Sequence, residues 1–156
     1  MDIQYKQIIC LNGHQLTDGA DWNKPVTGYC KKCGKKLIDS CLNCHSTIKG
    51  YYYVDGVTVI GRHSVYVPKY CEACGKPFPW TETSIKALEN LLTLSQLDQQ
   101  EQNELREAIP DLVSDTPKTK LAAYKWKKFG KPILDVAKDI LVGIATEATV
   151  RTIYPN

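Results

Sequence analysis

A tandem of cysteine pairs constrains this chain more than any other feature. Residues 28–44, GYCKKCGKKLIDSCLNC, contain two C-x-x-C turns, Cys30/Cys33 and Cys41/Cys44. Each such turn, called a knuckle below, can offer two thiolates to a divalent metal. Structural zinc needs four protein ligands in a tetrahedron. Each knuckle therefore requires a further pair of ligands from elsewhere in the chain.

Two more ligand pairs flank the tandem, one on each side. Seven cysteines and one histidine make eight ligands, enough for two zinc ions with no thiol left over. We predict two structural zinc sites whose pairs combine in chain order, because joining neighbouring pairs closes shorter loops than interleaving them. The first site comprises Cys10, His14, Cys30 and Cys33, and the second comprises Cys41, Cys44, Cys71 and Cys74.

The cysteines do not fit a disulfide framework or a redox centre. An odd number of cysteines would leave one thiol unpaired, and residues 1–4 do not begin a secretory signal. A thioredoxin-like protein would use one C-x-x-C in an α/β pattern, not three in a strand-rich segment. Catalytic zinc keeps one position open for water, whereas these ligands fill both tetrahedra. The sequence therefore favours structural zinc.

Bound zinc also changes the charge balance. The 156 residues carry a formal charge of +3, but seven thiolates and two Zn²⁺ ions bring the metallated chain to zero. A neutral protein attracts phosphate backbones weakly, so any nucleic-acid binding should be weak and nonspecific. No apolar run approaches the roughly 18 residues of a membrane-spanning helix, so we expect no membrane association.

Residues 1–80 have the turns and β-branched residues of a small β domain. Residues 3–11 predict a first strand, and residues 15–27 predict a loop in which Trp22 packs over a zinc site. Aromatic and β-branched residues on either side of Asp55-Gly56 predict a β-hairpin, followed by a short strand over residues 65–67. Glycine follows two of the three C-x-x-C pairs and permits positive φ, but His45 stands at the third such position.

Residues 81–156 change to helical periodicity. Thr81 is predicted to cap a first helix, with Trp80 packed against Ile85. Ser95, with Asp98 three residues later, is predicted to cap a second helix, which should end before Pro110. A third helix should span residues 117–130 and a fourth residues 132–148. The buried face of the fourth is predicted to contain Ile133, Val136, Ala137, Ile140, Leu141, Ile144, Ala145 and Ala148. We therefore predict an α+β protein: a double zinc-ribbon domain over residues 1–80, then an antiparallel bundle of about four helices over residues 81–156.

Two lysine clusters are candidate contacts for nucleic acid or phosphate. The lysines of the first cluster surround the first C-x-x-C pair. They either bind phosphate or offset thiolate charge, and the second interpretation is favoured. On the third helix they either bind nucleic acid or pack against the acidic helix before it, and again the second is favoured. The residues are Lys31, Lys32, Lys35 and Lys36 in the first cluster, and Lys125, Lys127 and Lys128 in the second.

The order of motifs resembles a known family. C-x3-H is followed by YCKKCGKK, CLNC and YCEACGKPFPWTE, and then by LREAIPDLVSDTPKTKLAAYKWKKF. This order is similar to that of a family of uncharacterised bacterial proteins, a domain of unknown function with paired zinc knuckles and a helical tail. The resemblance covers nearly the whole chain. It implies a bacterial, cytoplasmic protein and the same eight ligands, and it implies no established activity.

Three hypotheses about function follow. The sequence contains no P-loop, no G-x-G-x-x-G and no serine nucleophile motif, and no cysteine remains for catalysis. Our first hypothesis is a non-enzymatic interaction module that binds a protein partner, with the helical bundle as a second docking or oligomerisation surface. The second is a zinc-ribbon protein that binds nucleic acid. The third is a subunit of an enzyme or of a phage-defence complex, RING-like if the ligand pairs alternate between the two metals.

Overall fold

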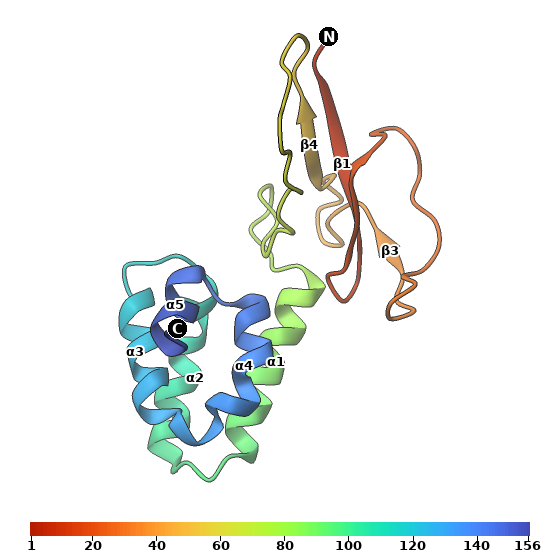
Figure 1. The fold of residues 1–156 in the computed structure, drawn as a ribbon. Coiled ribbons are helices and arrows are strands. Elements are labelled where there is room, and N and C mark those ends of the chain that lie inside the picture. The colour runs from red at the N-terminus through yellow and green to blue at the C-terminus, as the bar shows by residue number, and fades with distance from the viewer. The chain divides into compact units, whose positions relative to one another are not determined.

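A computed structural model describes residues 1–156, and the chain divides into two compact units, Met1–Thr81 and Glu82–Asn156. An antiparallel four-stranded sheet occurs in the first, and the helices account for most of the second (Figure 1). The fold class is α+β, as predicted. None of the helices combines the length and the apolar composition that crossing a bilayer requires.

Strand β1 (Ile3–Cys10) organises the sheet. It pairs antiparallel with β2 (Gln15–Ala20), β3 (Leu37–Ile38) and β4 (Lys49–Tyr53). Strands β1 and β4 run side by side in Figure 1. β4 passes so close to β2 that a Cβ atom at Gly50 would lie 2.1 Å from the carbonyl oxygen of Asp18. Glycine is therefore required at that position.

The prediction of a loop after the first strand is wrong in part. Residues 15–27 were expected to form a loop, but their first six residues form β2, because β1 offers a free edge to which they return through the turn after Cys10. Trp22 lies outside the buried cluster of this unit, with 38% of its surface exposed, and its packing over a zinc site stays a prediction.

The predicted hairpin is also wrong. A turn does occur at Asp55-Gly56, where the Val57 amide donates to the Val54 carbonyl at 3.3 Å. The partner of β4 is β1, however, and residues 57–67 form no strand, including residues 65–67. Side chains of other strands, and not backbone pairing with a neighbouring strand, hold this segment. We call residues 57–67 the strap.

The first unit has a small buried cluster. It contains Ile9, Ile38 and Ile48 from the sheet region, Phe78 and Trp80 from the segment after the last knuckle, and the ligand cysteines Cys41 and Cys71. The Phe78 and Trp80 rings stack with their centroids 4.8 Å apart. The Trp80 indole Nε1 donates to the Pro68 carbonyl at 2.9 Å. This aromatic pair therefore fixes the segment after Cys74 against the sheet region.

The helices are more numerous than predicted. Their bounds are α1 (Pro79–Leu94), α2 (Gln99–Val113), α3 (Thr119–Phe129), a 3-10 turn η1 (Lys131–Ile133), α4 (Leu134–Ile144) and α5 (Glu147–Ile153). At the centre of their core, the fully buried Trp126 donates its indole N–H to the Leu105 carbonyl at 3.0 Å. The third predicted helix corresponds to α3, which ends at Gly130 as expected.

Two helix starts and one helix end differ from prediction. α1 begins at Pro79, a favoured first residue, and Thr81 is buried inside its first turn with Oγ1 donating to the Lys69 carbonyl at 2.8 Å. Asp98, not Ser95, caps α2, in a capping box with Glu101. α2 continues through Pro110 because this ring faces solvent and the following Leu112 and Val113 are buried.

The predicted fourth helix is interrupted. Ala145 is extended, with ψ 161°, and Thr146 starts α5 by accepting the Thr149 amide at 3.2 Å. The Thr146 amide donates to the Leu112 carbonyl at 2.9 Å, so α2 supplies the acceptor that a continuous helix would have provided. The predicted face is only partly correct, since Val136 and Ala148 are exposed. The buried members are Ile133, Ala137, Leu141 and Ile144.

Candidate metal centres

The three C-x-x-C knuckles share one backbone conformation. In each, the amide after the second cysteine donates to the carbonyl of the first cysteine. These bonds are Gly34 to Cys30 at 2.7 Å, His45 to Cys41 at 2.9 Å and Gly75 to Cys71 at 2.8 Å. The donor residue has positive φ each time: 73° for Gly34, 64° for His45 and 76° for Gly75. The turn brings its two sulfurs to the same side of the backbone.

His45 takes the conformation of the glycine that it replaces. It is the one non-glycine residue of the chain with positive φ. Histidine is among the residue types that tolerate this region of backbone space better than most. Its side chain is exposed and does not belong to either ligand group. The irregular knuckle therefore differs from the other two in sequence and not in geometry.

The structure brings together Cys10, His14, Cys30 and Cys33. Cys10 ends β1, and the turn that leads into β2 places the His14 ring beside it, with Sγ and Nδ1 3.5 Å apart. The Cys30 Sγ lies 3.6 Å from the same Nδ1, and the Cys10 and Cys33 sulfurs are 3.6 Å apart. Cys10 is fully buried and the other three are half-buried.

A second group contains Cys41, Cys44, Cys71 and Cys74. The Cys41 and Cys74 sulfurs are 3.7 Å apart, and those of Cys44 and Cys71 are 3.6 Å apart. The Asn43 side-chain amide donates to the Cys74 sulfur at 3.5 Å. In both groups all ligand atoms lie within 4.8 Å of one another. The pairs combine in chain order, so the alternating arrangement of a RING-like module is absent.

These distances fit zinc. A regular tetrahedron with Zn–S of about 2.3 Å has S···S edges of about 3.8 Å, and a Zn–N bond of about 2.05 Å gives S···N edges of about 3.6 Å. The observed S···S separations of 3.6–3.7 Å and S···N separations of 3.5–3.6 Å match both values. The two tetrads are therefore consistent with two structural zinc ions.

The thiols need a cation if all of them are to ionise. Burial raises the pKa of Cys30, but the Lys32 and Cys33 amides and His14 outweigh it and lower that pKa to about 6. The Ser46 hydroxyl and amide lower the pKa of Cys44 to about 6. The Cys74 amide lowers the pKa of Cys71, but burial and two neighbouring sulfurs raise it to about 11. Adjacent sulfurs thus oppose each other's ionisation, and a bound divalent ion removes that opposition.

A buried ion pair supports the region between the two sites, and sequence reasoning missed it. Lys6 on β1 is 4% exposed, and its Nζ lies 2.6 Å from a carboxylate oxygen of Asp39. The same Nζ donates to the Lys24 carbonyl. Asp39 stands two residues before Cys41, and its carbonyl accepts the Ile48 amide at 2.8 Å. The available signal was a lysine in the interior of a predicted strand.

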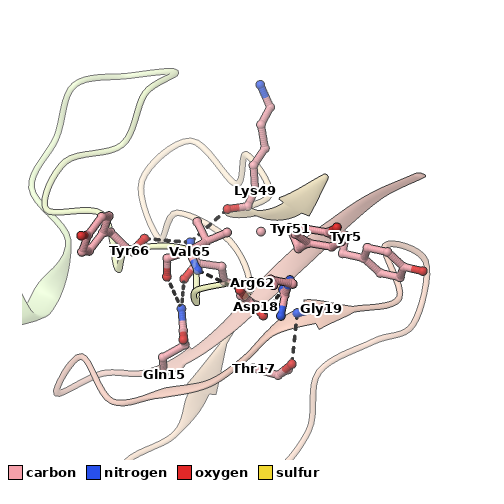
Figure 2. A network of polar contacts seen from close by, with 12 residues as sticks. Tyr5, Gln15, Thr17, Asp18, Gly19, Lys49, Tyr51, Arg62, Val65 and Tyr66 are labelled. Carbon is pink, nitrogen blue, oxygen red and sulfur yellow. Dashed lines mark hydrogen bonds and ion pairs between the residues drawn. The ribbon is translucent and has the colours of Figure 1, made fainter. Parts of the chain in front are cut away.

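A second buried network anchors the strap (Figure 2). The Asp18 carboxylate, on β2, accepts Arg62 at 2.7 Å and the Val65 amide at 2.8 Å. Gln15 donates its amide to the Val65 carbonyl at 2.7 Å and to the Gln7 side chain at 2.8 Å.

The same network continues from Gln7 and Arg62. Gln7, 1% exposed, donates to the Tyr66 carbonyl at 3.1 Å and to the Lys49 carbonyl at 3.0 Å. The Arg62 guanidinium lies 3.9 Å from the centre of the Tyr51 ring. No local motif announces these residues, since they come together only in the fold.

The two lysine clusters differ in their surroundings. Lys31, Lys32, Lys35 and Lys36 are all exposed. On α3, Lys125 forms an ion pair with Glu104 of α2 at 3.3 Å, which agrees with packing against the acidic helix. Lys127 and Lys128 are exposed, and the Lys128 Nζ lies 5.4 Å from the centre of the Phe129 ring.

Comparison with known proteins gives one match. A family model described as an uncharacterised protein conserved in bacteria (DUF2321) matches residues 3–153. No curated protein and no solved structure matches the chain. The family match confirms the resemblance that the order of motifs indicated.

Proposed function

The chain belongs to this family of bacterial proteins, whose description states no activity, and we propose that it is a non-enzymatic module that binds a protein partner. One observation carries the proposal: the strap presents apolar side chains to solvent while polar side chains of β1 and β2 hold it at Arg62, Val65 and Tyr66. The zinc sites build the scaffold that supports the strap.

The outward side chains of the strap are unusually apolar for an exposed segment. Ile60 and Tyr66 are each 93% exposed, and Val57 and Val59 are 55% and 52% exposed. Single exposed apolar residues are ordinary, but several on one short segment indicate a contact surface. Tyrosine is also among the residues that most often dominate binding energy at protein interfaces. These four residues are the candidate contacts.

The end of the strap that carries Tyr66 is anchored before any partner arrives. Asp18 and Gln15 bind the Val65 amide and carbonyl, and Gln7 binds the Tyr66 carbonyl. Arg62 is held between the Asp18 carboxylate and the Tyr51 ring. A segment that is already ordered loses little conformational entropy on binding. A fixed loop with apolar side chains outward is the arrangement that protein recognition requires.

The metal centres support a binding role in preference to a catalytic one. Each tetrad supplies four protein ligands, so a zinc ion held there by Cys10, His14, Cys30 and Cys33, or by the second tetrad, has no free position for a substrate or a nucleophilic water. Such an ion supplies folding energy and rigidity.

The helical unit offers no comparable surface. Its exposed large apolar residues are distributed over three helices, with at most two on any one helix. They are Leu94 on α1, Leu121 and Tyr124 on α3, and Val136 and Val142 on α4. We therefore assign the partner site to the strap.

The test compares two matched double variants. In the strap variant, Ile60→Asp is combined with Tyr66→Ser. In the control, Leu94→Asp is combined with Tyr124→Ser, which makes the same chemical change at residues that are 81% and 58% exposed on helices. Each tagged protein captures binding proteins from a bacterium that encodes it, and the proteins lost only with the strap variant are purified. By calorimetry, the wild type and the control should bind such a protein equally, and the strap variant about tenfold more weakly or worse. Identical recovery by all three proteins would contradict the proposal.

A further inference from the structure

Lysines are concentrated around the first zinc site, although the second site has the larger negative charge to offset. With zinc bound, three thiolates and a neutral histidine give the first site a net charge of −1, and four thiolates give the second site −2. Lysines that served to offset thiolate charge would gather at the second site. The first knuckle, residues 30–36, instead holds four of them.

The knuckles of the second site make the contrast sharper. Residues 41–46, CLNCHS, contain no lysine, and residues 71–76, CEACGK, contain Lys76 together with an acid, Glu72. Glu72 is paired with Lys49 at 2.9 Å. The more negative site thus has the fewer lysines on its turns. Offsetting thiolate charge does not account for the first knuckle, although it was the interpretation favoured from sequence.

The four lysines are also uncommitted within the fold. All are exposed, and none takes part in an ion pair, whereas Lys125 on α3 is paired with Glu104. Two lie between the ligand cysteines and two follow Gly34, and the Cys30 amide donates to the Lys35 carbonyl at 2.7 Å to close the turn. Four free positive charges are therefore concentrated on one rigid turn.

An exposed aromatic ring belongs to the same turn. Tyr29 precedes the first ligand of the knuckle, is 73% exposed, and is bridged by backbone pairing to Lys36. Lysines that contact backbone phosphates and an aromatic ring on which a base stacks are the components of a surface for single-stranded nucleic acid. We propose that this knuckle binds single-stranded nucleic acid, with phosphates on Lys31, Lys32, Lys35 and Lys36 and a base on Tyr29.

The proposal is compatible with a near-neutral protein. Four lysines contact at most about four phosphates, which gives a log–log salt slope of about −3 for a single strand. Nonspecific binding of this kind has a Kd of about 1–100 μM at physiological salt. The surface shares no residue with the strap, so this activity and the proposed protein binding can fail independently.

The experiment measures fluorescence anisotropy of labelled oligo(dT) and oligo(rU) with the full-length, zinc-loaded protein at several salt concentrations. A duplex of the same length and inorganic polyphosphate serve as competitors. The knuckle variant replaces Lys31, Lys32, Lys35 and Lys36 by glutamine. The matched control replaces four exposed lysines of the α3 region, Lys118, Lys120, Lys127 and Lys128, by glutamine. A zinc content of two per chain verifies the folding of residues 1–80 in each variant, and the far-UV circular dichroism signal of the wild type verifies the folding of the helices.

We expect the knuckle variant to bind at least about tenfold more weakly and to lose most of the salt slope. Tyr29→Leu should weaken binding about fivefold or more without changing that slope, because it removes stacking and no charge. The control should bind within about twofold of the wild type, since its lysines lie outside the knuckle. Wild-type binding by the knuckle variant, or loss confined to the control, would overturn the proposal. The proposal would also be overturned if Tyr29→Leu left the affinity unchanged and if polyphosphate or duplex competed as well as single strands do. The surface would then recognise charge without bases.

Discussion

The two units of this chain are similar in length and differ in what holds them together. The helical unit buries fifteen apolar side chains in one cluster around Trp126. The buried cluster of the first unit, called the zinc unit below, contains seven, and two of these are the ligand cysteines Cys41 and Cys71. A core of that size cannot by itself offset the conformational entropy of about 80 ordered residues. We therefore infer that metal coordination replaces the missing core in the first unit.

The same difference explains where the candidate functional surfaces lie. Because zinc supplies much of the folding energy, apolar residues such as Ile60 and Tyr66 are not needed for a core and are available at the surface. The helical unit uses most of its large apolar residues internally. We propose on this basis that residues 1–80 and 81–156 are separate domains, and the following predictions test how far their stabilities are independent.

The largest effect should come from removing zinc. Each structural zinc contributes about 10–16 kcal/mol of apparent binding energy in zinc-finger peptides, so a strong chelator should unfold residues 1–80 and leave the helices folded. The measurement is elemental analysis, with two zinc ions expected per chain, followed by NMR and far-UV circular dichroism during chelation. Fewer than two metals per chain in reducing buffer, or helical signal lost together with the metal, would break the comparison.

The opposite experiment removes the centre of the helical core. Trp126→Ala deletes a fully buried ring and its hydrogen bond to the Leu105 carbonyl, and should cost about 3–5 kcal/mol. Thermal unfolding followed at 222 nm should show this loss while zinc content stays at two. An exposed aromatic residue of the same unit offers the control: Tyr124→Ala should change stability by less than about 0.5 kcal/mol. Loss of zinc from the Trp126 variant would show that the units depend on each other.

A smaller effect should loosen the strap without unfolding its unit. Burial raises the pKa of Asp18, but the Val65 amide and Arg62 outweigh burial and hold that pKa below its ordinary value of 3.8. A carboxylate whose folded-state pKa is depressed stabilises the fold above its unfolded pKa and loses that contribution as the pH falls through the folded pKa. The contribution is therefore complete at neutral pH.

Asp18→Asn mimics the protonated carboxyl at a pH where zinc stays bound. We expect a loss of about 1–3 kcal/mol, because two hydrogen bonds to a buried charge are weakened. Amide hydrogen exchange should accelerate in residues 57–67 and remain slow in the helices. Unchanged exchange at Val65 would contradict the role of Asp18. In Asp55→Asn, which alters an exposed carboxylate outside the network, strap exchange should not change.

The smallest effect is expected from a substitution that makes the three knuckles more alike in sequence. His45 has φ 64°, where a side chain is strained, so His45→Gly should stabilise the zinc unit by about 0.5–1 kcal/mol. The reverse change, Gly34→His, has no steric obstacle around its Cβ and should cost about 1–2 kcal/mol through backbone strain alone. Zinc competition titrations measure both. A loss of zinc affinity in His45→Gly would show that His45 has a role beyond the turn.

Features that depend on neighbours a few residues apart could be predicted from the amino-acid sequence. C-x-x-C spacing brings two sulfurs to one side of a turn, so the ligand pairs could be named from residue types alone. The apolar period of α3 and its end at Gly130 are equally local. The count of eight ligands further limited the metal to two closed sites.

Features that depend on partners far away in the chain could be seen only in the folded protein. β4 had a turn signal for pairing with the residues after it, but β1 was the better partner, and those residues became the strap. The helix after Pro132 ended at Ala145 because the Leu112 carbonyl offered Thr146 an acceptor. Asp18, Gln7 and Arg62 look like ordinary surface residues until the fold surrounds them. Their roles are set by burial and by long-range hydrogen bonds, which a linear pattern does not contain because it records which residues are near in sequence and not which are near in space.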